Sequence, residues 1–128
     1  VSADFDGDGF NDVLVQGEAP DSPPTLHMNH RGSGHWVELQ FRGADNNTSG
    51  IGAQVRFRWG SRSELRELYG PRALNQTPTR LHQGLGSSEV VEIDVRWPDG
   101  SHTLGTDLPV NRVLTAVHAE AELRSLGR

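Results

Sequence analysis

Three segments of the chain alternate apolar and polar residues with a period of two. Their apolar members form three sets: Val37, Leu39 and Phe41; Ile51, Ala53, Val55, Phe57 and Trp59; and Val91, Ile93, Val95 and Trp97. Because successive side chains of a strand point to opposite faces, each set lies on one face and the polar residues between its members lie on the other. The pattern therefore predicts three β-strands that bury one face in a shared core.

Shorter and less regular segments at residues 64–69, 80–82 and 112–118 predict further strands. Pro98-Asp99-Gly100 predicts a tight turn into residues 101–104, since proline presets φ and glycine accepts positive φ. The 128 residues include fifteen glycines and seven prolines, a content typical of a protein with many turns. Together these features predict an all-β fold, an antiparallel β-sandwich or barrel. Residues 119–126 carry a helical pattern and could equally be a frayed tail.

Four aspartates crowd the start of the chain: Asp4, Asp6, Asp8 and Asp12. Carboxylates held this close repel one another, so the spacing favours a loop that binds a hard divalent cation. Gly7 and Gly9 permit the positive φ angles of a loop that closes around an ion. Carboxylates and a main-chain carbonyl suit the six to eight oxygen ligands of calcium better than the octahedron of magnesium. We predict a calcium site formed by the side chains of Asp4, Asp6, Asp8 and Asp12 and the carbonyl of Phe10.

This loop differs from an EF-hand. Its first positions overlap the EF-hand consensus, but the twelfth position is Val15, where an EF-hand has a bidentate glutamate. The apolar run Val13–Val15 follows the loop and no helical pattern precedes it, so a strand–loop–strand setting is expected. An acidic turn without an ion is the alternative, because Asp and Gly are ordinary turn residues.

Residues 3–15 resemble the calcium loop of FG-GAP repeats, also called VCBS repeats, which form the blades of integrin-type β-propellers. The resemblance implies that a propeller precedes this loop and that the chain is a C-terminal fragment of a longer protein. We therefore expect residues 1–29 to be the remnant of such a repeat and a linker rich in Pro and Gly, with a short strand near residues 26–29. Because a terminal segment is ordered only where it is tied down, calcium binding here is expected to be weak.

Five segments further along the chain resemble, in order, the motifs of the ASPIC/UnbV domain. They are residues 34–39 (GHWVEL), 49–55 (SGIGAQV), 81–86 (LHQGLG), 95–100 (VRWPDG) and 111–115 (NRVLT). This family is related to the C-terminal region of the cartilage acidic proteins and typically follows FG-GAP repeats. The resemblance implies an extracellular binding or adhesion module over residues 30–118, with a C-terminal tail at residues 119–128, and it implies no catalytic residue.

Two Gly-x-Gly pairs, around Ile51 and Leu85, predict bulges or tight corners that are each anchored by one apolar side chain. A phosphate-binding loop is the alternative, but it needs a helix N-terminus after the glycines, and the sequence predicts none there.

Three arginines, Arg56, Arg58 and Arg96, are expected to share an outward face with Glu92 and Asp94. If their strands are neighbours, these residues form a ladder of cross-strand ion pairs. A site for a carboxylate- or sulfate-bearing glycan is the sharper alternative, since arginine forks bind such anions.

The composition argues against several classes of function. The chain has no cysteine, which excludes disulfides and thiolate metal sites, and its net charge of −5 argues against a nucleic-acid surface. No apolar run approaches the roughly twenty residues that span a bilayer. The six histidines show no metal-ligand spacing and no Gly-x-Ser-x-Gly elbow is present, so we predict that the chain is not an enzyme. All twelve basic residues are arginine, which suggests a bacterial source.

We therefore predict a non-catalytic, calcium-binding module of an extracellular or cell-surface protein that serves adhesion or ligand interaction. The expected partners are a β-propeller of the same parent chain and an extracellular protein or glycan, with no nucleic acid and no membrane span. Two alternatives remain: a carbohydrate-binding or substrate-positioning accessory domain of a larger surface enzyme, and a structural cap of the propeller.

Overall fold

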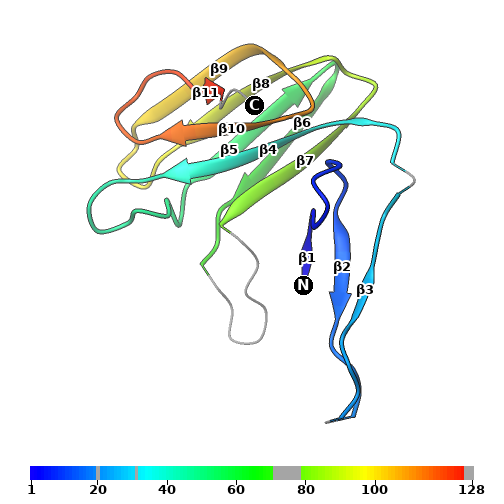
Figure 1. Cartoon of the computed structure of the whole chain (residues 1–128). Helices are drawn as coiled ribbons and strands as arrows, with labels where there is room; N and C mark the ends of the chain where they lie inside the picture. The colour runs from blue at the N-terminus through cyan, green and yellow to red at the C-terminus, as the bar shows by residue number, and fades with distance from the viewer. Residues whose placement is uncertain (20, 31, 71–78, 126–128) are drawn as a thin grey trace. The chain divides into compact units, whose positions relative to one another are not determined.

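The computed structural model describes residues 1–19, 21–30, 32–70 and 79–125. Eleven strands and no helix occur in these residues (Figure 1), so the predicted all-β class is confirmed. Contacts divide them into one unit within residues 1–33 and a second unit within residues 34–70 and 79–125. In the part of the chain so described, no helix has the length and hydropathy needed to cross a membrane.

The first unit is a three-stranded antiparallel sheet. Its strands, in the order β1-β2-β3, are β1 (Ser2–Ala3), β2 (Asp12–Val15) and β3 (Thr25–His27). Ala3 pairs with Asp12, so the acidic loop is the connection of a β-hairpin. The loop is therefore held between two strands, as expected for a strand–loop–strand setting. The strand predicted near residues 26–29 is β3.

The second unit contains two four-stranded sheets (Figure 1). One has the order β11-β10-β4-β7, with bounds β4 (His35–Arg42), β7 (Arg80–Gly86), β10 (Arg112–Val117) and β11 (Arg124–Ser125). The other has the order β6-β5-β8-β9, with bounds β5 (Gln54–Trp59), β6 (Arg62–Glu67), β8 (Val90–Arg96) and β9 (His102–Pro109).

The inward faces of both sheets fill one hydrophobic core, because the alternating segments point their apolar side chains the same way. The buried residues of this core are Val37, Leu39, Ala53, Val55, Phe57, Leu85, Val91, Ile93, Val95, Trp97, Leu114 and Ala116. Almost every member of the three alternating sets is therefore buried or packed against buried residues. The arrangement is a β-sandwich and not a closed barrel.

One pairing within the first of these sheets is parallel, which corrects the prediction of a purely antiparallel fold. β10 runs parallel to β4, with Leu114 opposite Leu39 and Ala116 opposite Phe41. Parallel neighbours cannot be joined by a hairpin, so the chain crosses to the other sheet and returns before β10 begins. The sequence predicts a strand at β10, but it carries no signal for the neighbouring strand or its direction.

Side chains and backbone bonds connect the two sheets at both edges of the sandwich. On one side, the Arg66 guanidinium donates to the carbonyl of His82 at 2.7 Å and the Gln83 amide donates to Glu64 at 3.2 Å. On the other side, the amide of Leu104 donates to the carbonyl of Ala121 at 2.8 Å. Charged residues that point inward from an edge strand, as Glu64 and Arg66 do, also discourage pairing with another chain.

The Gly-x-Gly prediction is correct at one position and wrong in part at the other. Around Leu85, the register with β4 slips between His35 and Trp36, and Leu85 is the buried extra residue of the bulge. Gly50 and Gly52 do adopt positive φ angles of 70° and 86°. The apolar side chain between them, however, is 40% exposed and so does not anchor that corner in the core.

The helical pattern at residues 119–126 is also wrong where the structure describes it. Residues Arg124–Ser125 form β11, which pairs antiparallel with β10, and Ala119 has a φ of 66° that no α-helix allows. Backbone bonds to Leu104 hold the segment before β11, and they override a weak local preference for helix. Residues 126–128 lie outside the described residues.

Candidate functional site

Two aspartates of the acidic loop, Asp4 and Asp12, each accept two hydrogen bonds from backbone amides. Asp4 accepts from the amides of Gly7 at 2.7 Å and Gly9 at 2.9 Å, one on each oxygen. These glycines have φ angles of 79° and 93°, the left-handed region that was predicted for them. The loop is therefore wound around the Asp4 carboxylate.

Asp12 fixes the far end of the loop. Its carboxylate is 1% exposed and accepts from the amides of Asn29 at 2.8 Å and Phe5 at 2.9 Å. These two hydrogen bonds, with Asn29 the larger contributor, hold the pKa of Asp12 below its ordinary value against the opposing effect of burial. Asp12 is therefore ionised and ties both the loop and the end of β3 to β2.

One carboxylate oxygen from each of Asp4, Asp6 and Asp12 lies within 4.8 Å of the other two. Oxygen atoms of Asp6 and Asp8 form a second group of the same size with a ring nitrogen of His30. Each carboxylate oxygen keeps a lone pair beyond its hydrogen bonds to amides, so both groups retain free acceptor positions. Each of the four predicted aspartates thus belongs to at least one group, and Asp6 belongs to both.

These donors fit calcium, since three or four carboxylates from one flexible loop supply the hard oxygen ligands that this ion prefers. Asp4, Asp6 and Asp12 would hold it, and Asp8 lies beside them. The carbonyl of Phe10 stays a prediction, although the Phe10 amide donates to Asp8 at 2.8 Å and so closes that side of the loop.

Sequence reasoning missed His30, because the six histidines show no metal-ligand spacing. Its Nδ1 lies 3.7 Å from a carboxylate oxygen of Asp6. Nearby, a Cβ at Gly32 would come within 2.0 Å of the Phe10 ring, so the backbone after His30 passes directly against the loop. This return of the chain from β3 depends on the pairing of β2 with β3, for which the histidine spacing gives no signal.

Comparison with known proteins identifies the family of the second unit. Residues 43–123 match the family described as ASPIC and UnbV, which is well over half of the chain. The chain belongs to the ASPIC and UnbV family. Four of the five segments that carried the predicted resemblance lie within this ASPIC and UnbV region. Residues 4–12 lie outside it, so the resemblance of the acidic loop to an FG-GAP repeat stays a prediction.

A relative supports the same assignment. Cartilage acidic protein 1 of Mus musculus is 29% identical over 128 aligned residues, which cover 95% of this chain and 20% of the mouse protein. The chain therefore spans about a fifth of the length of that relative.

On the outward face of the ASPIC and UnbV region, the predicted arginine ladder forms in part. Arg58 makes an ion pair with Glu92, and Arg56 lies opposite Asp94 in the register of β5 and β8. The Asp94 carboxylate, however, accepts a hydrogen bond from His102 Nδ1 at 2.7 Å. This outward face therefore carries separate pairs of charged and polar side chains, Arg58 with Glu92 and His102 with Asp94, in place of a continuous ladder. Each such surface pair contributes little to stability.

A serine, a histidine and an aspartate meet at the turn after β8, a cluster that the sequence did not predict. The Ser101 hydroxyl donates to Asp99 Oδ1 at 2.7 Å, and His118 Nε2 lies 2.8 Å from Asp99 Oδ2 and 3.5 Å from the Ser101 hydroxyl. Hydrogen bonds from the Ser101 hydroxyl and amide, and then from His118, hold the pKa of Asp99 well below its ordinary value. Pro98-Asp99-Gly100 signals the turn, but no local pattern signals His118.

This cluster lacks the order of a hydrolase triad. In a triad, one ring nitrogen of the histidine faces the serine and the other faces the aspartate. Here the serine and the aspartate lie on the same nitrogen, which must carry a proton because a carboxylate can only accept. That nitrogen cannot also take the proton of Ser101, so the geometry describes a fixed turn.

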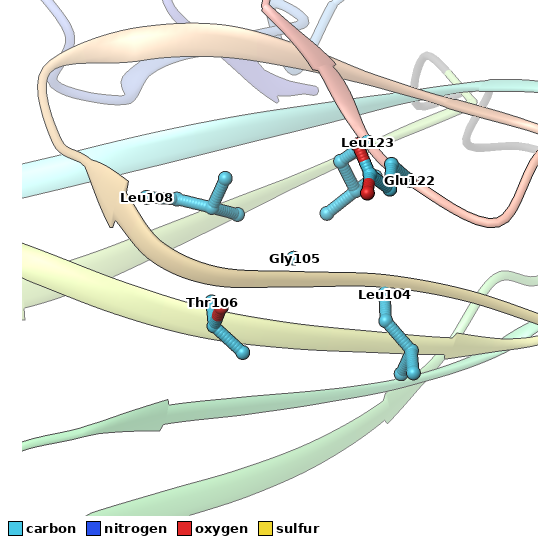
Figure 2. A pocket seen from close by; sticks show the side chains of 6 residues that line it. All are labelled: Leu104, Gly105, Thr106, Leu108, Glu122 and Leu123. Carbon is cyan, nitrogen blue, oxygen red and sulfur yellow. The ribbon is translucent and has the colours of Figure 1, made fainter.

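A crevice of about 320 Å³ opens where β9 separates from the segment that precedes β11 (Figure 2). In Figure 2 the side chains of Leu108 and Leu123 point toward each other across Gly105, while Leu104 and Thr106 point away on the other side of the strand. A Cβ at Gly105 would come within 2.6 Å of Leu108 and 2.9 Å of Leu123. The two leucines therefore close the end of the core, and the crevice is the outer edge of the sandwich.

Proposed function

We propose that this chain is a non-catalytic, calcium-supported extracellular module that adjoins an integrin-like β-propeller and serves adhesion or ligand interaction. One observation carries the calcium part: carboxylate oxygens of Asp4, Asp6 and Asp12 lie within 4.8 Å of one another around a loop with two left-handed glycines. Without a cation, this clustering of negative charge opposes the fold of the loop.

The propeller partner is supported by the surface of the three-stranded sheet. Three of its apolar side chains are nearly half exposed, with exposed fractions of 45% for Val13, 47% for Val15 and 44% for Leu26. Val13 and Val15 share one face of β2, because residues two apart on a strand point the same way. A small sheet with exposed β-branched residues gains stability by packing on or pairing with further β-structure, as a blade of a propeller does.

The extracellular setting is supported by the family and by the relative that is named for cartilage. The non-catalytic part is supported by the cluster of Asp99, Ser101 and His118, in which the histidine nitrogen nearest Ser101 is bonded to Asp99 and is not placed to take the proton of the serine. The match to a fifth of the mouse protein supports a role as one module within a larger chain.

Isothermal titration calorimetry with calcium tests the proposal. We expect the full chain to bind one calcium ion, and Asp6→Asn to abolish the binding because Asp6 belongs to both groups of donors. Asp21→Asn is the matched control, since it removes one exposed acidic charge of the same unit outside the loop. Magnesium at the same concentration should give a weaker signal.

Two results would contradict the calcium part. The first is an absence of heat from the wild-type chain at 10 mM calcium. The second is an equal loss of binding in Asp6→Asn and Asp21→Asn, which would show that calcium binding depends on the overall negative charge and not on the loop.

A further inference from the structure

A second candidate site lies within the ASPIC and UnbV region, away from the acidic loop. A small pocket of about 170 Å³ is lined by Gly43, Ala44 and Asn47 from the connection between β4 and β5, by Trp97, Pro98 and Asp99 from the turn after β8, and by His118 after β10. Its walls are mostly apolar. Asn47, Asp99 and His118 supply the polar groups, and the charge of Asp99 lies at the edge.

The pocket is held open by hydrogen bonds within its own walls. The Asn47 side chain donates to the carbonyl of Ile51 at 2.8 Å and accepts from the Ile51 amide at 2.9 Å. The amide of Gly43 donates to the carbonyl of Thr48 at 2.9 Å. The indole of Trp97 packs so closely that a Cβ at Gly50 would lie 2.9 Å from its ring. The cavity is therefore formed before any ligand arrives.

Asp99 gives this pocket a negative charge that faces solvent. Its side chain is 54% exposed, although three hydrogen bonds from Ser101 and His118 hold it in one position. A cationic group at the edge of the pocket would be attracted to it.

The size of the pocket limits its ligand. Pockets for whole small molecules measure roughly 300–1,000 Å³, and this one is about half the lower bound. It has room for the end of one side chain, whose backbone stays outside. An aliphatic stem that ends in a positive charge matches both features, because Lys and Arg bury their stems on apolar surface and keep the charged group at the edge.

We propose that this pocket binds a basic side chain, lysine or arginine, of a protein partner, with the aliphatic stem against Ala44 and Pro98 and the charged end at Asp99. The proposal concerns only the ASPIC and UnbV region and does not depend on calcium. It predicts that a partner of this region presents a protruding basic residue.

NMR titration of the full chain with N-acetyl-lysine N-methylamide tests this. The arginine analogue is the parallel probe, and N-acetyl-norleucine N-methylamide is the control, because it keeps the stem and lacks the charge. We expect saturable shifts at the Trp97 indole N–H and the amides of Ala44 and Ser101, with lysine or arginine binding about fivefold tighter than norleucine, as for an exposed ion pair. Equal binding of norleucine would overturn the proposal, and so would shifts confined to residues 104–108.

A charge variant gives a second test. Asp99→Asn keeps an acceptor for Ser101. It should lower the affinity for the lysine analogue about fivefold, to that of the norleucine analogue. Asp107→Asn is the matched control, since it removes the same charge from β9 outside the pocket. If Asp99→Asn unfolds, the comparison of probes on the wild type still decides. Unchanged lysine binding by a folded Asp99→Asn would overturn the proposal.

Discussion

The indole nitrogen of Trp97 donates a hydrogen bond to Oγ1 of Thr103 at 2.9 Å, and both side chains are almost fully buried. Thr103 Oγ1 also lies 2.7 Å from the carbonyl of Glu120, to which it donates. This chain of bonds links the end of β8, the start of β9 and the segment after β10, and so connects elements of both sheets. A buried polar group that loses such a partner is costly, which makes the pair a sensitive place to test the fold.

The first prediction is that Thr103→Val lowers the free energy of unfolding by about 1–3 kcal/mol, because the valine leaves the indole N–H of Trp97 and the carbonyl of Glu120 without partners. Chemical denaturation of the full chain measures the loss. Thr103→Ser is the matched control, since it keeps the hydroxyl and removes only a methyl group, with a cost of about 1 kcal/mol. A larger loss in Thr103→Ser than in Thr103→Val would contradict this account.

The second prediction is that Trp97→Ala lowers the free energy of unfolding by about 3–5 kcal/mol, since the side chain is 2% exposed in the core. The Phe41 and His118 rings lie edge-on to the indole, at centroid distances of 6.2 and 5.4 Å. Trp97→Phe keeps part of this packing, so its loss should be smaller in the same denaturation experiment. A loss below about 1 kcal/mol for Trp97→Ala would mean that the indole lies on the surface.

Much of the sandwich could be predicted from the sequence, because the two-residue period reports directly which residues of a strand face the core. Val55, Ile93 and Leu39 are buried as that period requires. The turn of the acidic loop could also be predicted, because Asp4 and Gly7 lie close in sequence and form a local hydrogen bond.

The features that the sequence could not predict depend on contacts between distant segments. The parallel pairing of β4 with β10 joins residues such as Leu39 and Leu114, and neither strand carries a signal for its partner. The same limit applies to His118, which meets Asp99 only because β10 ends beside the turn after β8. In both cases several contacts are compatible with the local sequence pattern, and the tertiary structure determines which of them forms.

The third prediction concerns acid. Because the folded-state pKa of Asp99 is depressed, its contribution to stability is fully present above the unfolded pKa of about 3.9 and is lost as the pH falls through the folded-state value. Thermal melts from pH 7 to pH 2 should show Asp99→Asn less stable than the wild type at pH 7, with a difference that shrinks below about pH 4. Asp45→Asn is the control for the change of charge. A constant difference across this range would contradict the assignment.

The fourth prediction separates Asp12 from the other aspartates of the loop. Asp12 accepts from the amides of Phe5 and Asn29, so Asp12→Ala should speed hydrogen exchange at both amides even in calcium-free buffer. Asp6→Ala is the control, because the Asp6 carboxylate accepts from the Asp8 amide within the loop, and this variant should leave the Asn29 amide protected. Equal protection of Asn29 in the wild type and in Asp12→Ala would show that Asp12 does not hold the two strands together.

The last prediction is that the two units respond separately to calcium. The core of the second unit is formed by its own two sheets, so residues 34–128 should fold after deletion of residues 1–33 and show a cooperative melt by circular dichroism. In the full chain, an assumed dissociation constant of about 10⁻⁴ to 10⁻³ M, as for extracellular modules, lets 1 mM calcium stabilise the loop by about 0.4–1.4 kcal/mol. That gain should appear as slower hydrogen exchange at Gly7 and Gly9, whose amides are bonded to Asp4, and not as a higher melting temperature of the second unit. The truncated chain is the control, since it lacks the loop and should be insensitive to calcium. A truncated chain without a cooperative transition would show that the first 33 residues are part of the same core.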